Sequence, residues 1–346
     1  MIRLTFMNVT RNKKMIEEEI IADIKKLTTS LLENSSDQTE VEKIINQIHV
    51  HFQEITKITG YDVNIEYLAA VPTAKGKALG LNHAAQCLLD YKRTVQFLKA
   101  ILQAIKEKQN AHPNELINIF YAGCGPYAPF ITLVAYFFDP KEVRFSVLEV
   151  NKNSLESAKK LIRALRLTDY VDNFYLADAV TFEVPEPDTF DILISETLDA
   201  VLYRECYVPI LFNLLPQLNN NITLIPENVL INLKLLPKTS TNQDYFEGDA
   251  GTILNVRKEV SSYTGDPDEL SQLPEKVVDL KSMNIDHYKS ILIETQVHIY
   301  NDIWLYRNES SLTLPIEVAL EQPFLNSSVV FTYHLEPEIE LKCRFQ

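Results

Sequence analysis

The sequence has few cysteines and no long apolar run. Its four cysteines are scattered and form no CxxC pair: Cys87, Cys124, Cys206 and Cys343. This spacing argues against a zinc site and against a disulfide framework. No run of about 18 apolar residues occurs, so we expect no membrane span. The first residues, MIRLTFMNVTRNKK, are too polar for a signal peptide. The sequence therefore predicts a reduced, cytoplasmic protein with no bound metal.

Basic residues are also scarce, with 33 Lys and Arg against 47 Asp and Glu, a formal net charge of −14. A surface of this sign repels phosphate backbones, so nucleic acid is not expected as a partner. The same charge suits a cationic substrate, although solubility alone is the simpler explanation for it. The 346 residues are enough for two domains, or for one with large additions.

Helical periodicity dominates the first part of the chain. Residues 13–58 predict two amphipathic helices separated by a break at 33–39. Residues 59–80 look irregular and hold three of the eight glycines. A long helix is predicted over 82–108. The two N-terminal helices suit a dimer surface, a lid or a partner-binding module, and composition does not separate these alternatives.

Short apolar runs then alternate with helical segments. Strands are predicted over 117–121, 143–150, 171–176, 191–195, 222–225 and 229–235, and helices over 128–136, 154–167 and 204–218. Such alternation is typical of an α/β protein with a mostly parallel sheet covered by helices. After about residue 237 the predicted elements are strands, over 291–300, 303–306, 312–320, 328–334 and 339–345. These indicate a separate antiparallel β region.

The segment 122–126 (AGCGP) joins a predicted strand to a predicted helix. Its glycines allow the backbone to approach a ligand closely, and the helix N-terminus beyond offers free N–H groups. Alone, the segment indicates either a nucleotide-like ligand or only a tight turn. Ala128 stands where a dinucleotide fingerprint has its third glycine, which mildly disfavours a pyrophosphate. Cys124 is expected to be a small packed side chain.

Acidic residues stand at the ends of the next two predicted strands. Glu149 is placed to accept the two hydroxyls of a ribose, and Asp178 to accept from an adenine amino group. Either acid alone could equally be a solvated strand end. The glycine turn and the two acids, in this chain order, together describe an adenosine site without a phosphate binder.

Two glutamates flank the loop that follows the strand at 191–195. Glu196 stands at the carboxyl end of that strand, where open α/β sheets bind ligands, and Glu205 comes nine residues later. Paired carboxylates on one loop can clamp a planar guanidinium through two-pronged hydrogen bonds. The alternative is one helix-start acid and one surface acid. Asp199 lies between them and is expected to add to an acidic rim.

Together these segments resemble the protein arginine methyltransferases, well over about residues 82–237 and more faintly over the C-terminal strands. The likeness rests on GCGP followed by VLEVNKN, on SETLDAVLYRE, on LIPENV at 224–229 and on LDYKRT at 89–94. It implies an α/β fold with a seven-stranded Rossmann-like methyltransferase sheet and a C-terminal antiparallel, barrel-like β domain. The helical periodicity adds an N-terminal helical region, for which the family offers no counterpart. The corresponding domains are 1–80, 81–237 and 238–346.

The resemblance also implies S-adenosyl-L-methionine as the cofactor and a role for each matching residue. Arg93 is assigned to the carboxylate of the methionine moiety, Glu149 to the ribose and Asp178 to the adenine. Glu196 and Glu205 are assigned to the substrate guanidinium, and so to catalysis. The complete set expected to bind the cofactor is Arg93, Ala122, Gly123, Gly125, Glu149, Val150, Asp178, Ala179 and Glu196.

The sequence departs from the family in two places. Asp199 stands where the family's loop usually has a glycine, and the later Thr-His-Trp string is absent. Residues 286–288 (DHY) and the segment around His298 are its candidate replacements, and Trp304 is predicted to be a core residue. The acceptor stays open between arginine in a protein or peptide and free arginine or another small guanidine. The alternatives are a methyltransferase with a non-guanidine acceptor and a non-catalytic partner of the same fold. A homodimer is compatible with all of these.

Overall fold

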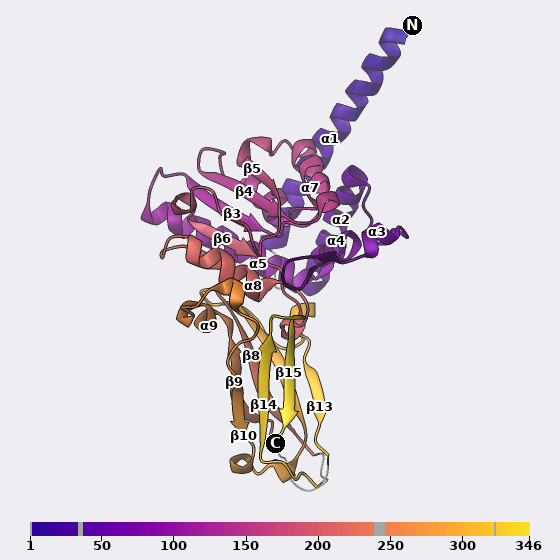
Figure 1. Cartoon of the computed structure of the whole chain (residues 1–346). Coiled ribbons are helices and arrows are strands. Elements are labelled where there is room, and N and C mark those ends of the chain that lie inside the picture. The colour runs from indigo at the N-terminus through magenta and orange to yellow at the C-terminus, as the bar shows by residue number, and fades with distance from the viewer. Residues whose placement is uncertain (1, 34–36, 239–245, 322) are drawn as a thin grey trace. The chain divides into compact units, whose positions relative to one another are not determined.

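The computed structural model describes residues 2–33, 37–238, 246–321 and 323–346, with only the backbone described for 2–17. The chain divides into two compact units (Figure 1). Unit 1 is Met1–Ala70 with Leu79–Ala177, and unit 2 is Val71–Ala78 with Asp178–Gln346. The three predicted domains, 1–80, 81–237 and 238–346, stay a prediction. None of the described helices is long and apolar enough to cross a membrane.

Unit 1 begins with two helices, as predicted. They are α1 (Ile2–Glu33) and α2 (Gln38–Thr56), so α1 starts eleven residues before the predicted boundary at 13. Within the predicted break at 33–39, residues 34–36 lie outside the described residues. The Asp37 carboxylate accepts the Glu40 N–H at 3.2 Å and caps α2. The apolar side of α2 is buried, which accounts for its helical periodicity.

The prediction of a single helix over 82–108 is wrong. The chain instead forms α4 (Leu81–Gln86), a 3₁₀ turn η1 (Cys87–Leu89) and α5 (Tyr91–Ala111). Asp90 has non-helical angles, with φ −78° and ψ 84°. The Thr94 hydroxyl donates to the Leu88 carbonyl at 3.0 Å, replacing a backbone bond of a continuous helix. The break places Arg93 in the first turn of α5.

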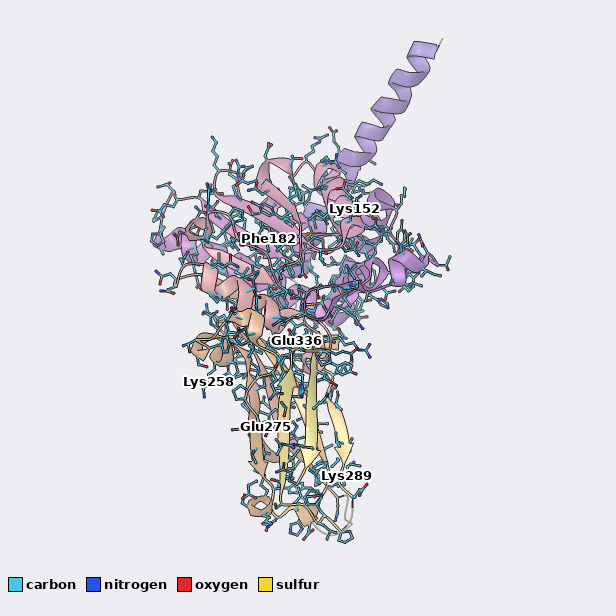
Figure 2. The ribbon with its side chains drawn as sticks, in the orientation of Figure 1. Lys152, Phe182, Lys258, Glu275, Lys289 and Glu336 are labelled. Carbon is cyan, nitrogen blue, oxygen red and sulfur yellow. The ribbon has the colours of Figure 1, made fainter. Side chains whose placement is uncertain are left out.

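Three parallel strands form the sheet of unit 1, in the order β5-β4-β3. They are β3 (Ile117–Ala122), β4 (Val143–Glu149) and β5 (Val171–Leu176), and all three were predicted. β4 is almost wholly buried, as expected for the central strand of a covered parallel sheet. Helix α7 (Lys152–Ala164), which begins at the Lys152 labelled in Figure 2, packs on β4 and β5. The carboxyl ends of β3 and β4 therefore lie side by side.

Unit 2 contains another parallel pair, β6 (Ile192–Ser195) and β7 (Thr223–Ile225). Helix α8 (Tyr207–Leu214) and the 3₁₀ turn η6 (Leu215–Gln217) separate them. The helix predicted over 204–218 thus begins three residues late, because the preceding residues belong to an ordered loop with the 3₁₀ turn η5 (Ala200–Leu202). A small hairpin, β1 (Val71–Pro72) with β2 (Lys77–Ala78), also belongs to this unit.

The rest of unit 2 is antiparallel, as predicted. One sheet has the order β12-β11-β8-β9, with β13 on β11, and a second has the order β10-β14-β15. Their bounds are β8 (Asn228–Pro237), β9 (Gly248–Asn255), β10 (Lys276–Asp279), β11 (Tyr288–Tyr300), β12 (Ile303–Leu305), β13 (Ile316–Ala319), β14 (Ser328–His334) and β15 (Glu340–Phe345).

Several details of this region differ from the sequence-based expectation. The strand predicted over 229–235 is β8, and it pairs antiparallel with β9 and β11 rather than joining a parallel sheet. The segment 312–320 opens with a 3₁₀ turn, η10 (Ser311–Thr313), before β13. β9, β10 and helix α9 (Val256–Ser262) were not predicted. Seven sheet strands and a barrel stay predictions.

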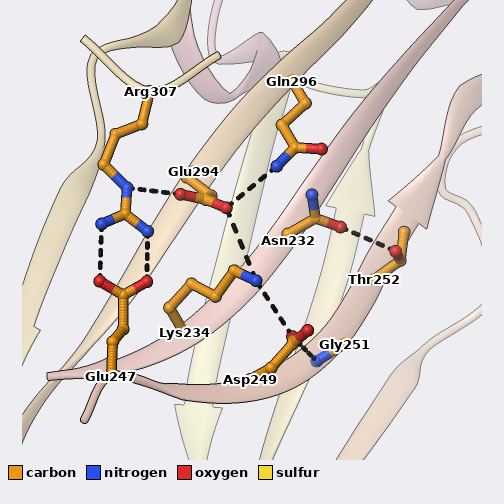
Figure 3. Close-up of polar contacts among 9 residues, drawn as sticks. All are labelled: Asn232, Lys234, Glu247, Asp249, Gly251, Thr252, Glu294, Gln296 and Arg307. Atoms are coloured by element: carbon orange, nitrogen blue, oxygen red, sulfur yellow. Dashed lines mark hydrogen bonds and ion pairs between the residues drawn. The ribbon is translucent and has the colours of Figure 1, made fainter.

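An ion-pair network crosses one face of the β12-β11-β8-β9 sheet (Figure 3). Glu294 of β11 is only 2% exposed and accepts from the Nε of Arg307. The two terminal nitrogens of Arg307 bond the two carboxylate oxygens of Glu247. Lys234 of β8 lies 3.3 Å from Asp249 and 4.0 Å from Glu294. Since side chains alternate along a strand, Thr295 beside Glu294 faces the other side of the sheet.

Candidate functional site

The glycine turn follows β3 directly in unit 1. Gly123 and Gly125 have φ of 77° and 63°, which only glycine adopts without strain. The Gly123 N–H donates to the Leu148 carbonyl at 2.8 Å and so extends the ladder between β3 and β4. Among the described residues, a Cβ on Gly125 would meet nothing nearer than the Ala84 Cβ at 4.0 Å. The conformation, rather than crowding, requires glycine there, and the space beside the backbone is open.

Glu149 ends β4 beside this turn and is only 6% exposed. Its Oε2 accepts the Gly125 N–H at 2.8 Å, and its Oε1 accepts the Asn151 N–H at 2.9 Å. Burial raises the pKa of the Glu149 carboxyl, and backbone N–H groups of Asn151, Gly125 and Val150 partly oppose that shift. The acid predicted to bind ribose therefore also clamps the glycine turn. A carboxylate oxygen has more than one lone pair with which to accept a donor.

The helix predicted over 128–136 is much shorter in the structure. It consists of α6 (Pro129–Thr132) and the 3₁₀ turn η2 (Ala135–Phe137). The Thr132 hydroxyl donates to the Tyr127 and Ala128 carbonyls, both at 3.1 Å, and Ala128 itself has φ 41°. One helical turn adds little dipole, so the expected helix N-terminus is not a significant part of this site.

Helix α2 supports the turn from the side of the N-terminal helices. The Tyr127 hydroxyl donates to the Ile58 carbonyl at 2.8 Å, just beyond the end of α2. The Tyr127 ring packs on Phe52 and edge-on to His49 of α2. Burial lowers the pKa of His49. One function of α2 is therefore to pack the segment that follows the glycine turn. Neighbouring Cys124 is buried, as expected, and burial and Glu149 raise its pKa.

Asp178 belongs to unit 2, where its carboxylate is held by two backbone donors. Oδ1 accepts the Val180 N–H at 2.9 Å, and Oδ2 accepts the Ala74 N–H at 2.6 Å. Ala74 lies in the β1–β2 hairpin, which the sequence showed only as a glycine-containing irregular stretch. Asp178 is half-buried, and the adjacent Ala179 is buried. The hairpin is thus a neighbour of the predicted adenine acid that sequence reasoning missed.

The same hairpin contacts the end of the two-glutamate loop. The Lys77 N–H donates to the Arg204 carbonyl at 3.3 Å, and the Thr73 hydroxyl lies 3.0 Å from Cys206 Sγ. Burial is the largest cause of the raised pKa of Cys206, which is about 12, and the charges of Asp178 and Glu205 add to it. Cys206 is therefore a packed neutral thiol that senses the charges of two of the predicted site acids. Asp178 and Glu205 lie in one electrostatic environment within unit 2.

The loop from Glu196 to Glu205 begins where β6 ends, and both glutamates are half-buried. Between them, Asp199 Oδ1 accepts the Tyr203 N–H at 2.7 Å and the Arg204 N–H at 3.3 Å. Burial raises the pKa of Asp199, and these backbone donors partly offset it. The Asp199 carboxylate therefore closes the turn that leads to Glu205, and its contribution to an acidic rim stays a prediction.

The middle of this loop has an unusual backbone. Val201 and Leu202 have φ of 54° and 56°, a conformation that β-branched residues rarely adopt. Two distant side chains hold it: the Val201 N–H donates to Thr295 Oγ1, and the Tyr333 hydroxyl donates to the Leu202 carbonyl, both at 2.8 Å. Sequence reasoning missed Thr295 and Tyr333, and no local pattern marks either of them.

The candidate replacements for the absent Thr-His-Trp string lie at opposite ends of β11. Tyr288 is seven residues from Thr295, roughly 23 Å along a strand, whereas His298 is three residues away, roughly 10 Å. Residues 286–288 are therefore not neighbours of the loop. His298 stacks on Trp304 with ring centroids 4.0 Å apart and lies 3.2 Å from Glu227. Trp304 is half-buried between His298 and Tyr306, so its prediction as a core residue is wrong.

Among the described residues, no group of three or more His, Cys, Asp or Glu side chains is placed to hold a metal ion. Arg93 is buried in the first turn of α5 in unit 1. The roles predicted for Arg93, the glycine turn, Glu149, Val150, Asp178, Ala179, Glu196 and Glu205 stay predictions.

No protein-family model matches the chain, and no curated protein sequence matches it. Among solved structures, it is similar to a chain of the Trypanosoma brucei PRMT1 enzyme-prozyme heterotetrameric complex with AdoHcy. That similarity has 8% sequence identity and a TM-score of 0.48, and it covers 75% of this chain and 92% of the other.

Proposed function

We propose that the chain is an S-adenosyl-L-methionine-dependent methyltransferase whose acceptor is a guanidino nitrogen. The observation that carries the proposal is the clamp between Glu149 and the Gly125 N–H, 2.8 Å long. It fixes a buried acid at the carboxyl end of one parallel strand beside a glycine turn at the end of the next. This edge is where open α/β sheets bind nucleotide-like ligands.

The proposal assigns the ribose of the cofactor to Glu149. Its Oε2 accepts the Gly125 N–H and its Oε1 the Asn151 N–H, and a carboxylate oxygen has more than one lone pair with which to accept a donor. Two hydroxyl groups on adjacent carbons match two such acceptors. Arg93 is assigned to the cofactor's carboxylate and Asp178 to its adenine. The single turn of α6 offers little to a phosphate, which favours an adenosine ligand over a dinucleotide.

Glu196 and Glu205 are assigned to the acceptor. When bound, the cofactor would supply an electrophilic methyl group on a sulfonium sulfur, with the S–C bond breaking as the N–C bond forms and the sulfur leaving as a neutral thioether. A guanidinium is a poor nucleophile because its lone pairs are delocalised. Two carboxylates that accept its N–H groups would hold positive charge away from the attacking nitrogen and stabilise the cation as the new N–C bond forms. They would also align the nitrogen for in-line attack, and the proton can leave after transfer.

The test is transfer of a labelled methyl group from the cofactor to arginine, small guanidino compounds and arginine-rich peptides. We expect label in at least one guanidino acceptor, and label only in a non-guanidine acceptor would refute the acceptor assignment.

Glu196→Gln should lower turnover about 100-fold or more, as expected for loss of charge stabilisation, with cofactor Kd nearly unchanged. Glu183→Gln, at an exposed position, is the matched control. Arg93→Ala should instead weaken cofactor binding. Absence of any cofactor binding by calorimetry would identify a non-catalytic protein.

A further inference from the structure

The two-glutamate loop has a conformation that its own residues do not favour. Val201 and Leu202 follow one another with φ of 54° and 56°, and neither is glycine. A β-branched residue in this region brings its Cβ close to the backbone and is strained. Such backbone persists only where the surrounding structure over-determines it. Something outside the loop must therefore hold it.

Two buried hydroxyl groups supply that restraint. Thr295 Oγ1 accepts the Val201 N–H, and Tyr333 Oη donates to the Leu202 carbonyl, each at 2.8 Å. Thr295 is 0% exposed and Tyr333 is 2% exposed. Water does not reach these groups, so loss of either hydroxyl leaves a backbone polar group without a partner in the folded loop. The two strained residues are thus each tied by one side chain.

The two hydroxyl groups come from rigid elements in different sheets. Thr295 lies in β11 opposite Ile231 of β8, and Tyr333 lies in β14 opposite Leu341 of β15. The residue before Thr295, Glu294, is fixed on the other face by Arg307 (Figure 3). The loop is therefore anchored to the two antiparallel sheets that contain β11 and β14, while Asp199 closes its turn toward Glu205.

We infer that Thr295 and Tyr333 are positioning residues that hold Glu196 and Glu205 in the geometry needed to bind the acceptor. The inference rests on the proposed function for the role of the glutamates. According to this inference, the C-terminal strands contribute to catalysis although neither of the two carboxylates comes from them. Their contribution is to impose, through two hydroxyl groups, the loop conformation on which both carboxylates depend.

The test removes one hydroxyl at a time with little change of shape. Thr295→Val and Tyr333→Phe should each lower kcat about 10- to 100-fold, as the loss of one buried hydrogen bond predicts, with cofactor Kd within about twofold of wild type. Thr295→Ser keeps the hydroxyl and should retain most of the activity. The matched controls are Thr332→Val, from the residue before Tyr333, and Tyr263→Phe, whose hydroxyl bonds the Asp266 carbonyl at 3.0 Å outside the loop.

Amide hydrogen exchange gives a readout that does not depend on methyl transfer. The Val201 amide should exchange slowly in wild type and about 10- to 100-fold faster in Thr295→Val, with no change in β11 or β14. Unchanged exchange in the loop, or kcat equal to that of the controls in an active enzyme, would overturn the inference. If wild type transfers no methyl group but Thr295→Val loosens the loop, the restraint is real and the proposed function has failed. The inferred catalytic role then fails with it.

Discussion

Replacement of Glu149 by glutamine tests the centre of the glycine-turn site without changing its shape. The carboxylate accepts the Gly125 and Asn151 N–H groups on its two oxygens, at 2.8 and 2.9 Å. A glutamine side chain has one oxygen and one NH₂ group. Whichever way it is oriented, one backbone N–H then faces another donor, in a site only 6% exposed. The variant would therefore lose either the bond from the Gly125 N–H or the bond from the Asn151 N–H.

The size of the effect follows from the burial of this clamp. A buried donor left without a partner costs about 1–3 kcal/mol, and the remaining bond loses its charged acceptor. We therefore expect the free energy of unfolding to fall by about 2–4 kcal/mol. For a unit of this size each kcal/mol lowers Tm by about 2–4 °C, so Tm should fall by about 4–16 °C. Under the proposed function, the cofactor Kd should also rise at least about tenfold, since one charged acceptor is lost.

The pH dependence gives a second, signed prediction. Burial raises the pKa of Glu149 in the folded protein, against the opposing backbone hydrogen bonds. A raised acid pKa means that stability is fully present below the unfolded value and is lost as pH rises through the folded pKa. Glutamine does not titrate. The contribution of Glu149 to the free energy of unfolding of wild type should therefore fall as pH rises from about 4.5, and Glu149→Gln supplies the pH profile without this titration.

Thermal unfolding followed by circular dichroism over about pH 4–8 measures both effects. Glu156→Gln, at an exposed position of α7, is the control, because its pairing with Lys159 at 3.0 Å is a solvent-exposed surface contact. A Tm of Glu149→Gln within about 1 °C of wild type would refute the clamp's contribution. A stability difference between wild type and Glu149→Gln that widens with rising pH would refute burial as the dominant influence on this carboxyl group.

Two further predictions concern unit 2. Arg307→Met removes the close cationic partner of Glu294, which is 2% exposed, and should reduce the free energy of unfolding by about 3–5 kcal/mol. Urea titration measures the free energy of unfolding. The double variant Arg307→Met with Glu294→Gln should recover part of the loss. Arg307→Met as stable as wild type would contradict the role of the network. The Cys206 thiol, with its pKa raised to about 12, should resist iodoacetamide at about pH 8 in the native protein and react after denaturation. Mass spectrometry separates the two states, and rapid native labelling of Cys206 would contradict its packing.

Local signals in the sequence predicted many elements of both units. The strands at 117–121, 143–150 and 191–195 were predictable because short, mostly apolar runs mark buried parallel strands. The positions of Glu149 and Glu196 at strand ends followed from the same runs, since a polar residue ends the buried segment. The glycine turn was predictable because two closely spaced glycines rarely serve any other purpose before a helical segment.

Other local expectations failed because a side chain competed with the backbone. Periodicity predicted one helix over 82–108, but the Thr94 hydroxyl takes the Leu88 carbonyl and the chain restarts at Tyr91. Asp199 was expected to add to an acidic rim, and sequence spacing did not show that its carboxylate accepts two backbone N–H groups of its own loop. Such hydrogen bonds are decided by a few degrees of backbone angle, which hydrophobic spacing does not encode.

By itself, the sequence determined which residues could serve as acids, turns and buried strands, because those properties belong to segments of a few residues. Only the tertiary structure decided which distant residues contact these segments and fix their conformation. Thr295 meets Val201 across 94 residues of chain, and Tyr333 meets Leu202 across 131. Likewise, β8 reads as an ordinary apolar strand, and its antiparallel pairing depends on β9 and β11. Contacts over such separations form when the sheets pack, so no local pattern of apolar and polar residues records them.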